Sequence, residues 1–136
     1  MTSRGKAYEI KAQMQPNDST ILYLEDEIII ALDTAQTLED MGFRKVHTVH
    51  NLRRAEAAAQ SADKVFDCAL LDVNIAGEGL SLDLGRMLLA RGIPVVFASG
   101  YNRHEMEAEH SGLTFVEKPL NAETISDAFE RVVFSQ

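Results

Sequence analysis

Carboxylate side chains directly follow two short apolar runs in this sequence. Glu25 and Asp26 come after residues 21–24, and Asp72 comes after residues 68–71. In open parallel sheets, functional groups gather at the carboxyl ends of the strands. If the two runs are neighbouring strands, the three carboxylates therefore converge on one small pocket.

Three carboxylates in one pocket require a compensating cation. Two carboxylates about 4 Å apart repel by roughly 4 kcal/mol at an effective dielectric constant of 20, and this repulsion opposes full ionisation. Oxygen ligands with room for water favour Mg²⁺ or Mn²⁺, whereas the absence of His or Cys at these positions argues against zinc. We therefore expect a shared Mg²⁺ or Mn²⁺ ion.

A hydroxyl group and an ammonium group follow two further apolar runs. Ser99 comes after residues 95–98, and Lys118 comes soon after the shorter run 114–116. A metal-bound carboxylate with a Lys and a hydroxyl nearby suits phosphoryl transfer, in which the carboxylate attacks phosphorus and cations neutralise the equatorial oxygens. Asp72 is the natural nucleophile of such a reaction.

The apolar runs predict the strands that would position these groups. Unbroken apolar runs of this length indicate strands covered on both faces, whereas the mixed run 45–50 indicates an edge strand. Helical patterns alternate with the runs, which favours a parallel sheet with right-handed crossovers and helices on both faces. We predict a five-stranded, doubly wound α/β domain.

The helices are predicted from apolar spacing and from capping residues. Asn51, Ser81 and Asn121 are expected to begin the second, third and last helices. The segment 102–112 offers few apolar anchors, so a fourth helix should be short or mobile. For the first helix, residues 27–41, the spacing predicts a buried stripe made of Ile28, Leu32, Ala35, Leu38 and Met41.

Composition excludes several classes of function. A chain of 136 residues suffices for one domain, and we expect no second, output domain. The net charge of -8 disfavours nucleic acid and anionic membranes as partners. A single cysteine and the lack of a long apolar run favour a reduced, cytoplasmic protein. Residues 1–19 are expected to form a polar tail.

The residues at the strand ends resemble those of receiver domains in bacterial two-component response regulators. The matching segments are Leu-Glu-Asp-Glu at 24–27, Leu-Leu-Asp-Val-Asn at 70–74, Ser99, and Lys-Pro-Leu at 118–120. Four such signals in order are specific, although each alone is weak. The resemblance implies a flavodoxin-like (βα)5 receiver domain over residues 20–136, with strand order 2-1-3-4-5.

The resemblance also implies a role for each acidic residue. Asp72 would accept a phosphoryl group from a sensor histidine kinase or a histidine phosphotransfer protein. Asp26, Asp72 and the backbone carbonyl of Asn74 would bind Mg²⁺ directly, and Glu25 would bind it through water.

Further residues match the switch of the family. Ser99 and Lys118 would contact the phosphoryl oxygens, and Phe115 is the strand-five aromatic that turns inward in receivers. The segment 97–101 (Phe-Ala-Ser-Gly-Tyr) resembles the Phe-Ala-Thr-Gly-x-Tyr motif of stand-alone alphaproteobacterial receivers, with Ser in place of Thr. Tyr101 is expected either to cover the segment 102–112 or to limit the approach of water to Asp72.

The first helix carries more apolar surface than one buried stripe can hide. Ile29 or Ile30 should therefore be exposed beside the pocket. In receivers this helix face docks the helical bundle of a kinase or phosphotransfer protein, so the resemblance implies docking by Ile29 and Ile30, to which we add Pro119.

The expected function is that of a single-domain response regulator, which acts by contact with other proteins or as a phosphate sink. We expect the protein to be monomeric or weakly dimeric and to have no separate enzymatic activity. An alternative is an Mg²⁺-dependent phosphatase with an aspartyl-phosphate intermediate, although Asn74 stands where such enzymes commonly carry a second Asp. A pseudo-receiver that binds partners without phosphorylation is another. A flavin module is disfavoured, because the loop after residue 24 carries acids rather than phosphate-binding Gly, Ser and Thr.

Overall fold

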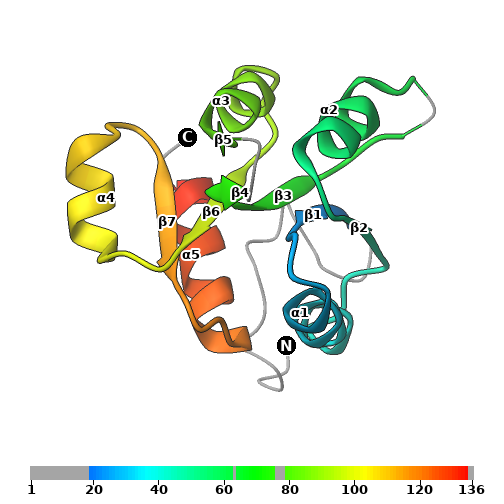
Figure 1. Cartoon of the computed structure of the whole chain (residues 1–136), viewed down its shortest axis with the longest axis horizontal. Helices are drawn as coiled ribbons and strands as arrows, with labels where there is room; N and C mark the ends of the chain where they lie inside the picture. The colour runs from blue at the N-terminus through cyan, green and yellow to red at the C-terminus, as the bar shows by residue number, and fades with distance from the viewer. Residues whose placement is uncertain (1–18, 63, 76–78, 135–136) are drawn as a thin grey trace.

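A five-stranded parallel sheet forms the centre of the protein (Figure 1). The computed structural model describes residues 19–62, 64–75 and 79–134. The sheet order is β2-β1-β3-β6-β7, which confirms the predicted order 2-1-3-4-5, because β6 and β7 are the fourth and fifth strands of this sheet. The strands are β1 (Thr20–Leu24), β2 (Lys45–Val49), β3 (Cys68–Asp72), β6 (Val95–Ser99) and β7 (Thr114–Glu117).

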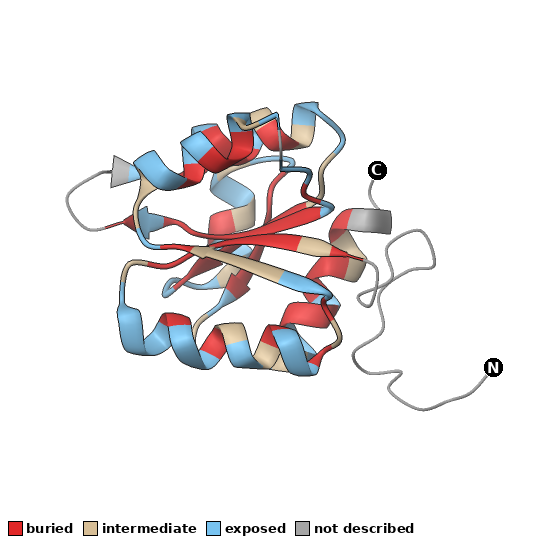
Figure 2. Cartoon of the chain, turned by 90° about the vertical axis from the view of Figure 1, so that its right-hand side faces the viewer, coloured by how far each residue is buried: buried red, intermediate tan, exposed pale blue. Residues whose placement is uncertain are grey.

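Helices cover both faces of the sheet (Figure 2). One core cluster joins the sheet to α2 and α3, and a second joins the other face to α1 and α5. A separate two-stranded antiparallel pair, β4 (Asn74–Ile75) and β5 (Gly79–Leu80), follows β3. The helices are α1 (Ile28–Asp40), α2 (Leu52–Gln60), α3 (Leu82–Ala90), α4 (Arg103–Glu109) and α5 (Ala122–Phe134).

The buried face of α1 differs from the predicted stripe. Ala31, Thr34 and Leu38 are the buried residues of this helix, whereas Ile28 is 53% exposed and Leu32 is 68% exposed. The prediction that these two residues are buried was wrong. The side of the helix that packs on the sheet carries Ala31, Thr34 and Leu38, so Ile28 and Leu32 project outward.

Two of the three predicted caps form as expected. The Asn51 side chain accepts a hydrogen bond from Arg54 N at 2.8 Å, and the Asn121 side chain accepts one from Thr124 N at 2.9 Å. Ser81 stands at the N-cap position of α3, but its hydroxyl does not cap the helix. The hydroxyl is fully buried and donates instead to the backbone carbonyl of a β3 residue.

The fourth helix is short, as its sparse apolar pattern predicts. It has seven residues, of which Met106 alone is buried. In the described ranges, no helix is long and apolar enough to span a membrane. The predicted polar tail, residues 1–19, lies outside the described residues except at its last position.

Candidate functional site

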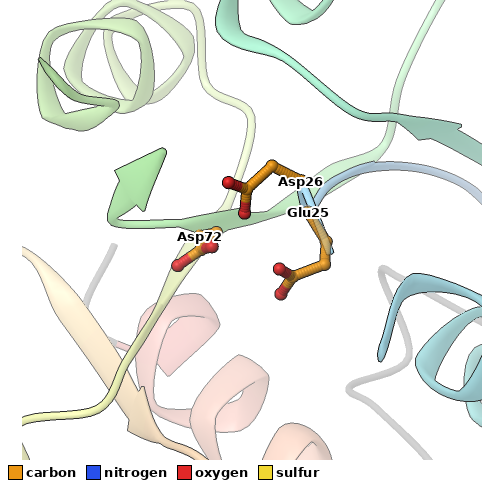
Figure 3. A group of neighbouring side chains, drawn as sticks. All are labelled: Glu25, Asp26 and Asp72. Atoms are coloured by element: carbon orange, nitrogen blue, oxygen red, sulfur yellow. The ribbon is translucent and has the colours of Figure 1, made fainter. Parts of the chain in front are cut away.

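The three predicted carboxylates meet at the carboxyl ends of β1 and β3 (Figure 3). In the parallel pairing of these strands, Leu24 lies opposite Leu71, so the residues that follow them become neighbours. One carboxylate oxygen from each of Glu25, Asp26 and Asp72 lies within 4.8 Å of the others. Glu25 and Asp72 are buried, so their charges need partners within the protein.

Lys118 provides one such partner from the end of β7. Its Nζ atom lies 3.1 Å from Asp72 Oδ1 and 3.3 Å from Glu25 Oε1. The backbone N–H of Lys118 donates to the Ser99 carbonyl at 2.8 Å, which ties it to the neighbouring strand. The peptide bond between Lys118 and Pro119 is cis.

The electrostatics of the site favour an additional cation. Burial and the nearby carboxylates raise the pKa of Glu25 and of Asp72 above their ordinary values, even though Lys118 acts in the opposite direction. Burial lowers the pKa of Lys118, but Asp72 and Glu25 outweigh this effect and raise it. One ammonium group cannot offset three carboxylates, and an all-oxygen donor set of this kind fits a hard divalent cation.

A cavity of about 640 Å³ opens beside Asp72. Asn74, Ser99, Tyr101 and Lys118 line it, so the structure brings these predicted site residues together. The Ser99 hydroxyl accepts a hydrogen bond from Tyr101 N at 3.0 Å, and the Tyr101 side chain is 66% exposed. Their roles in phosphoryl chemistry stay predictions.

Phe115 lies in the core rather than on the surface. Its side chain is fully buried, with ring centroids 5.4 Å from Phe97 and 5.9 Å from His110. Its backbone is held by Glu107, which accepts from Phe115 N at 3.0 Å, and by Arg131, which donates to Phe115 O at 2.9 Å. No local pattern in the sequence indicates these contacts, because they join three separate elements.

The predicted docking residues are exposed around the same end of the sheet. Ile29 is 82% exposed and Ile30 is 38% exposed at the beginning of α1, which confirms that apolar surface lies at this position. Pro119 is also exposed. Since Ile28 and Leu32 of the same helix are exposed as well, the apolar surface is larger than predicted.

Two supporting contacts were not predicted from the sequence. The Ser81 hydroxyl donates to the backbone carbonyl of Asp72 at 2.6 Å. The His50 Nδ1 atom lies 3.0 Å from the backbone carbonyl of Glu25. Each contact holds the backbone of an acidic residue, from nine residues away for Ser81 and from 25 residues away for His50. The sequence signals neither contact, because Ser81 looks like an ordinary helix cap.

Solved structures of response regulators resemble this chain. SdrG from Sphingomonas melonis Fr1 is 30% identical, with a TM-score of 0.70, and the match covers 85% of this chain and 96% of that one. A response regulator receiver protein from Sinorhizobium medicae WSM419 is 25% identical, with a TM-score of 0.71 and coverage of 86% and 95%.

The chemotaxis response regulator CheY4 of Vibrio cholerae is 27% identical, with a TM-score of 0.68 and coverage of 84% and 98%. No protein-family model matches the sequence. A search of curated proteins likewise found no match.

Proposed function

This chain belongs to the receiver domain family of response regulators, and from this premise we propose that Asp72 accepts a phosphoryl group from the phosphohistidine of a kinase or phosphotransfer protein. The observation that carries the proposal is the meeting of Glu25, Asp26 and Asp72 with the Lys118 ammonium beside an open cavity. A nucleophilic carboxylate, oxygen ligands for a cation and an ammonium group together suit phosphoryl transfer to a carboxylate.

The proposed step balances as a nucleophilic displacement. A carboxylate oxygen of Asp72 forms a bond to phosphorus while the bond between phosphorus and the imidazole nitrogen breaks. The imidazole nitrogen keeps the electron pair and takes up a proton from solvent. Lys118, which already contacts Asp72 Oδ1 at 3.1 Å, is placed to balance the charge of the incoming phosphoryl oxygens.

We propose Glu25, Asp26, Asp72 and the carbonyl of Asn74 as the residues that hold Mg²⁺, with Glu25 acting through water. When bound, Mg²⁺ neutralises charge on the phosphoryl oxygens. The hard oxygen donors support Mg²⁺ over a transition metal that prefers His or Cys.

Ser99 is proposed as the residue that responds to phosphorylation. In this structure its oxygen accepts from Tyr101 N, and a phosphoryl group on Asp72 would offer a charged acceptor to which the Ser99 O–H donates. The domain then signals through an altered surface near Tyr101, or it drains phosphate from a kinase. We propose no enzymatic turnover of a separate substrate.

The test is the intact mass after incubation with Mg²⁺ and acetyl phosphate. We expect a gain of one phosphoryl group that disappears in Asp72→Asn and in EDTA. Asp127→Asn, which changes an exposed carboxylate of α5, is the matched control and should still be phosphorylated. An unmodified protein with no donor consumed would favour a pseudo-receiver, and donor consumed over many turnovers would favour a phosphatase.

A second experiment tests docking by the exposed isoleucines of α1. Ile29→Lys should slow phosphoryl transfer from a phosphohistidine protein but leave phosphorylation by acetyl phosphate unchanged, because the small donor needs no protein contact. Val65→Lys changes another exposed apolar residue at the opposite edge of the sheet and should affect neither reaction. Equal rates for both variants with the protein donor would contradict docking at this face.

A further inference from the structure

A second cleft lies at the amino-terminal edge of the sheet, opposite the acidic site. Thr20 begins β1, Lys45 begins β2, and Phe66 comes two residues before β3. Since the three strands are parallel, their first residues share one edge, and their last residues lie near Asp72 at the other. The cleft has a volume of about 270 Å³. Because it lies at the amino-terminal edge of the sheet, the cleft is separate from the acidic site.

The cleft concentrates positive charge in a protein whose net charge is -8. Arg44, Lys45 and Lys64 all line it, together with His47. Within the part of the chain that the structure describes, none of these three cations forms an ion pair. By contrast, Lys118, Arg103 and Arg131 all pair with carboxylates.

The acid that the structure describes beside the cleft, Asp67, is engaged with the backbone at the start of β1. Asp67 follows Phe66, and its carboxylate accepts a hydrogen bond from Thr20 N at 2.8 Å. His47, which is partly buried, responds to the cations beside it: burial lowers its pKa, and the charges of Lys64 and Lys45 lower it further. The cleft thus has a positive potential that an anion would relieve.

The walls of the cleft define the size and type of the anion. The rings of His47 and Phe66 are in contact, with centroids 5.6 Å apart, and Val65, which is 77% exposed, adds apolar surface. A guanidinium and two ammonium groups suit the oxygens of a phosphate. The volume is smaller than that of most ligand pockets, so a phosphate with a few further atoms would fill it.

We propose that this cleft binds a small phosphate-bearing molecule, with Arg44, Lys45 and Lys64 around the phosphate and Val65 and Phe66 against its organic part. A long polyanion is disfavoured, because the rest of the protein carries a large negative charge. The site is independent of phosphorylation at Asp72, since it lies at the other edge of the sheet.

The test is an NMR titration of the full chain with inorganic phosphate and with phenyl phosphate. EDTA removes divalent cations from the acidic site, and chloride keeps the ionic strength constant. We expect saturable shifts of the His47 ring and of the Thr20 and Lys45 amides, a rise in the pKa of His47 with ligand, and tighter binding of phenyl phosphate. His104, which is exposed on α4, should not respond.

Matched variants separate a built site from general charge attraction. Arg44→Gln with Lys64→Gln should weaken binding by about tenfold or more. Arg53→Gln with Arg86→Gln removes the same charge from exposed positions on α2 and α3 and should change affinity less than about twofold. Equal losses in the two variants, shifts no larger than those with chloride, or binding of an acidic peptide in preference to either phosphate would overturn the proposal.

Discussion

Phe115 lies on β7, at an edge of the sheet, where one side of a strand has no neighbouring strand to pair with. Glu107 of α4 and Arg131 of α5 supply the missing partners. Glu107 Oε2 accepts from Phe115 N and, at 2.8 Å, from Arg131 Nη1, while Arg131 Nη2 donates to Phe115 O. The pair therefore clamps two helices onto the strand that carries the predicted switch aromatic.

The structure gives a magnitude for the loss of this clamp. A hydrogen bond to a charged group contributes roughly 1.5–3 kcal/mol, against about 0.5–1.5 kcal/mol for a neutral one. Glu107→Gln keeps an acceptor but removes the charge, so we expect the free energy of unfolding to fall by about 1 kcal/mol. Arg131 is partly exposed, which screens the ion pair, and its coupling to Glu107 should be only about 0.5–1 kcal/mol.

The effect should depend on pH in a defined direction. Partial burial raises the pKa of Glu107, but the Phe115 N–H and the Arg131 guanidinium outweigh it and hold the pKa below its usual value. A lowered folded-state pKa stabilises the protein above the unfolded-state value of about 4.3, and this stabilisation is lost as the pH falls through the folded-state pKa. The difference between wild type and Glu107→Gln should thus be full at neutral pH and shrink in acid.

Urea denaturation at several pH values measures this difference. Glu109→Gln, which alters a carboxylate on the same helix that is 74% exposed, is the control and should be nearly neutral. A double-mutant cycle with Arg131→Met gives the coupling energy. The reasoning is refuted if Glu107→Gln matches Glu109→Gln at neutral pH, or if the coupling energy is zero.

Two further predictions concern the packing around the site. Gly85→Ala places a methyl group 2.0 Å from Phe97 Cζ. We therefore expect the free energy of unfolding to fall by about 1–3 kcal/mol and the midpoint of thermal unfolding to fall with it. The control is Gly100→Ala, which meets no atom within 4 Å and should change the midpoint little. Ser81→Ala removes the 2.6 Å bond to the Asp72 carbonyl and should lower the free energy of unfolding by about 1–2 kcal/mol in urea titrations. A Gly85→Ala protein as stable as wild type, or a neutral Ser81→Ala, would contradict these contacts.

The fold and the acidic cluster were predictable because both follow from the pattern of apolar and acidic residues at neighbouring positions of the sequence. Each apolar run is a strand, and each strand places the next residue at the carboxyl edge of the sheet. Only the pairing of β1 with β3 had to be assumed for Glu25, Asp26 and Asp72 to meet, and the structure supplies it.

The clamp and the basic cleft were not predictable, because they depend on contacts between distant segments. Glu107 and Arg131 are 24 residues apart, and each alone has the appearance of an exposed helical charge. Arg44 and Lys64 come from different connections and become neighbours only after β1, β2 and β3 align. Periodicity reports which face of an element is apolar, but not which charged side chains of two elements meet.

The wrong prediction that Ile28 and Leu32 of α1 are buried has a consequence for partner binding. Apolar spacing cannot choose between two faces of a helix when both carry large apolar residues, and here the face with Ala31 and Thr34 packs on the sheet. Ile28, Ile29 and Leu32 then remain in water, where they do not contribute to the core. Several exposed large apolar side chains on one short stretch of helix favour the proposed protein contact at this surface. Because α1 begins two residues after Asp26, the proposed docking of a kinase or phosphotransfer protein on this surface would hold a phosphohistidine close to Asp72.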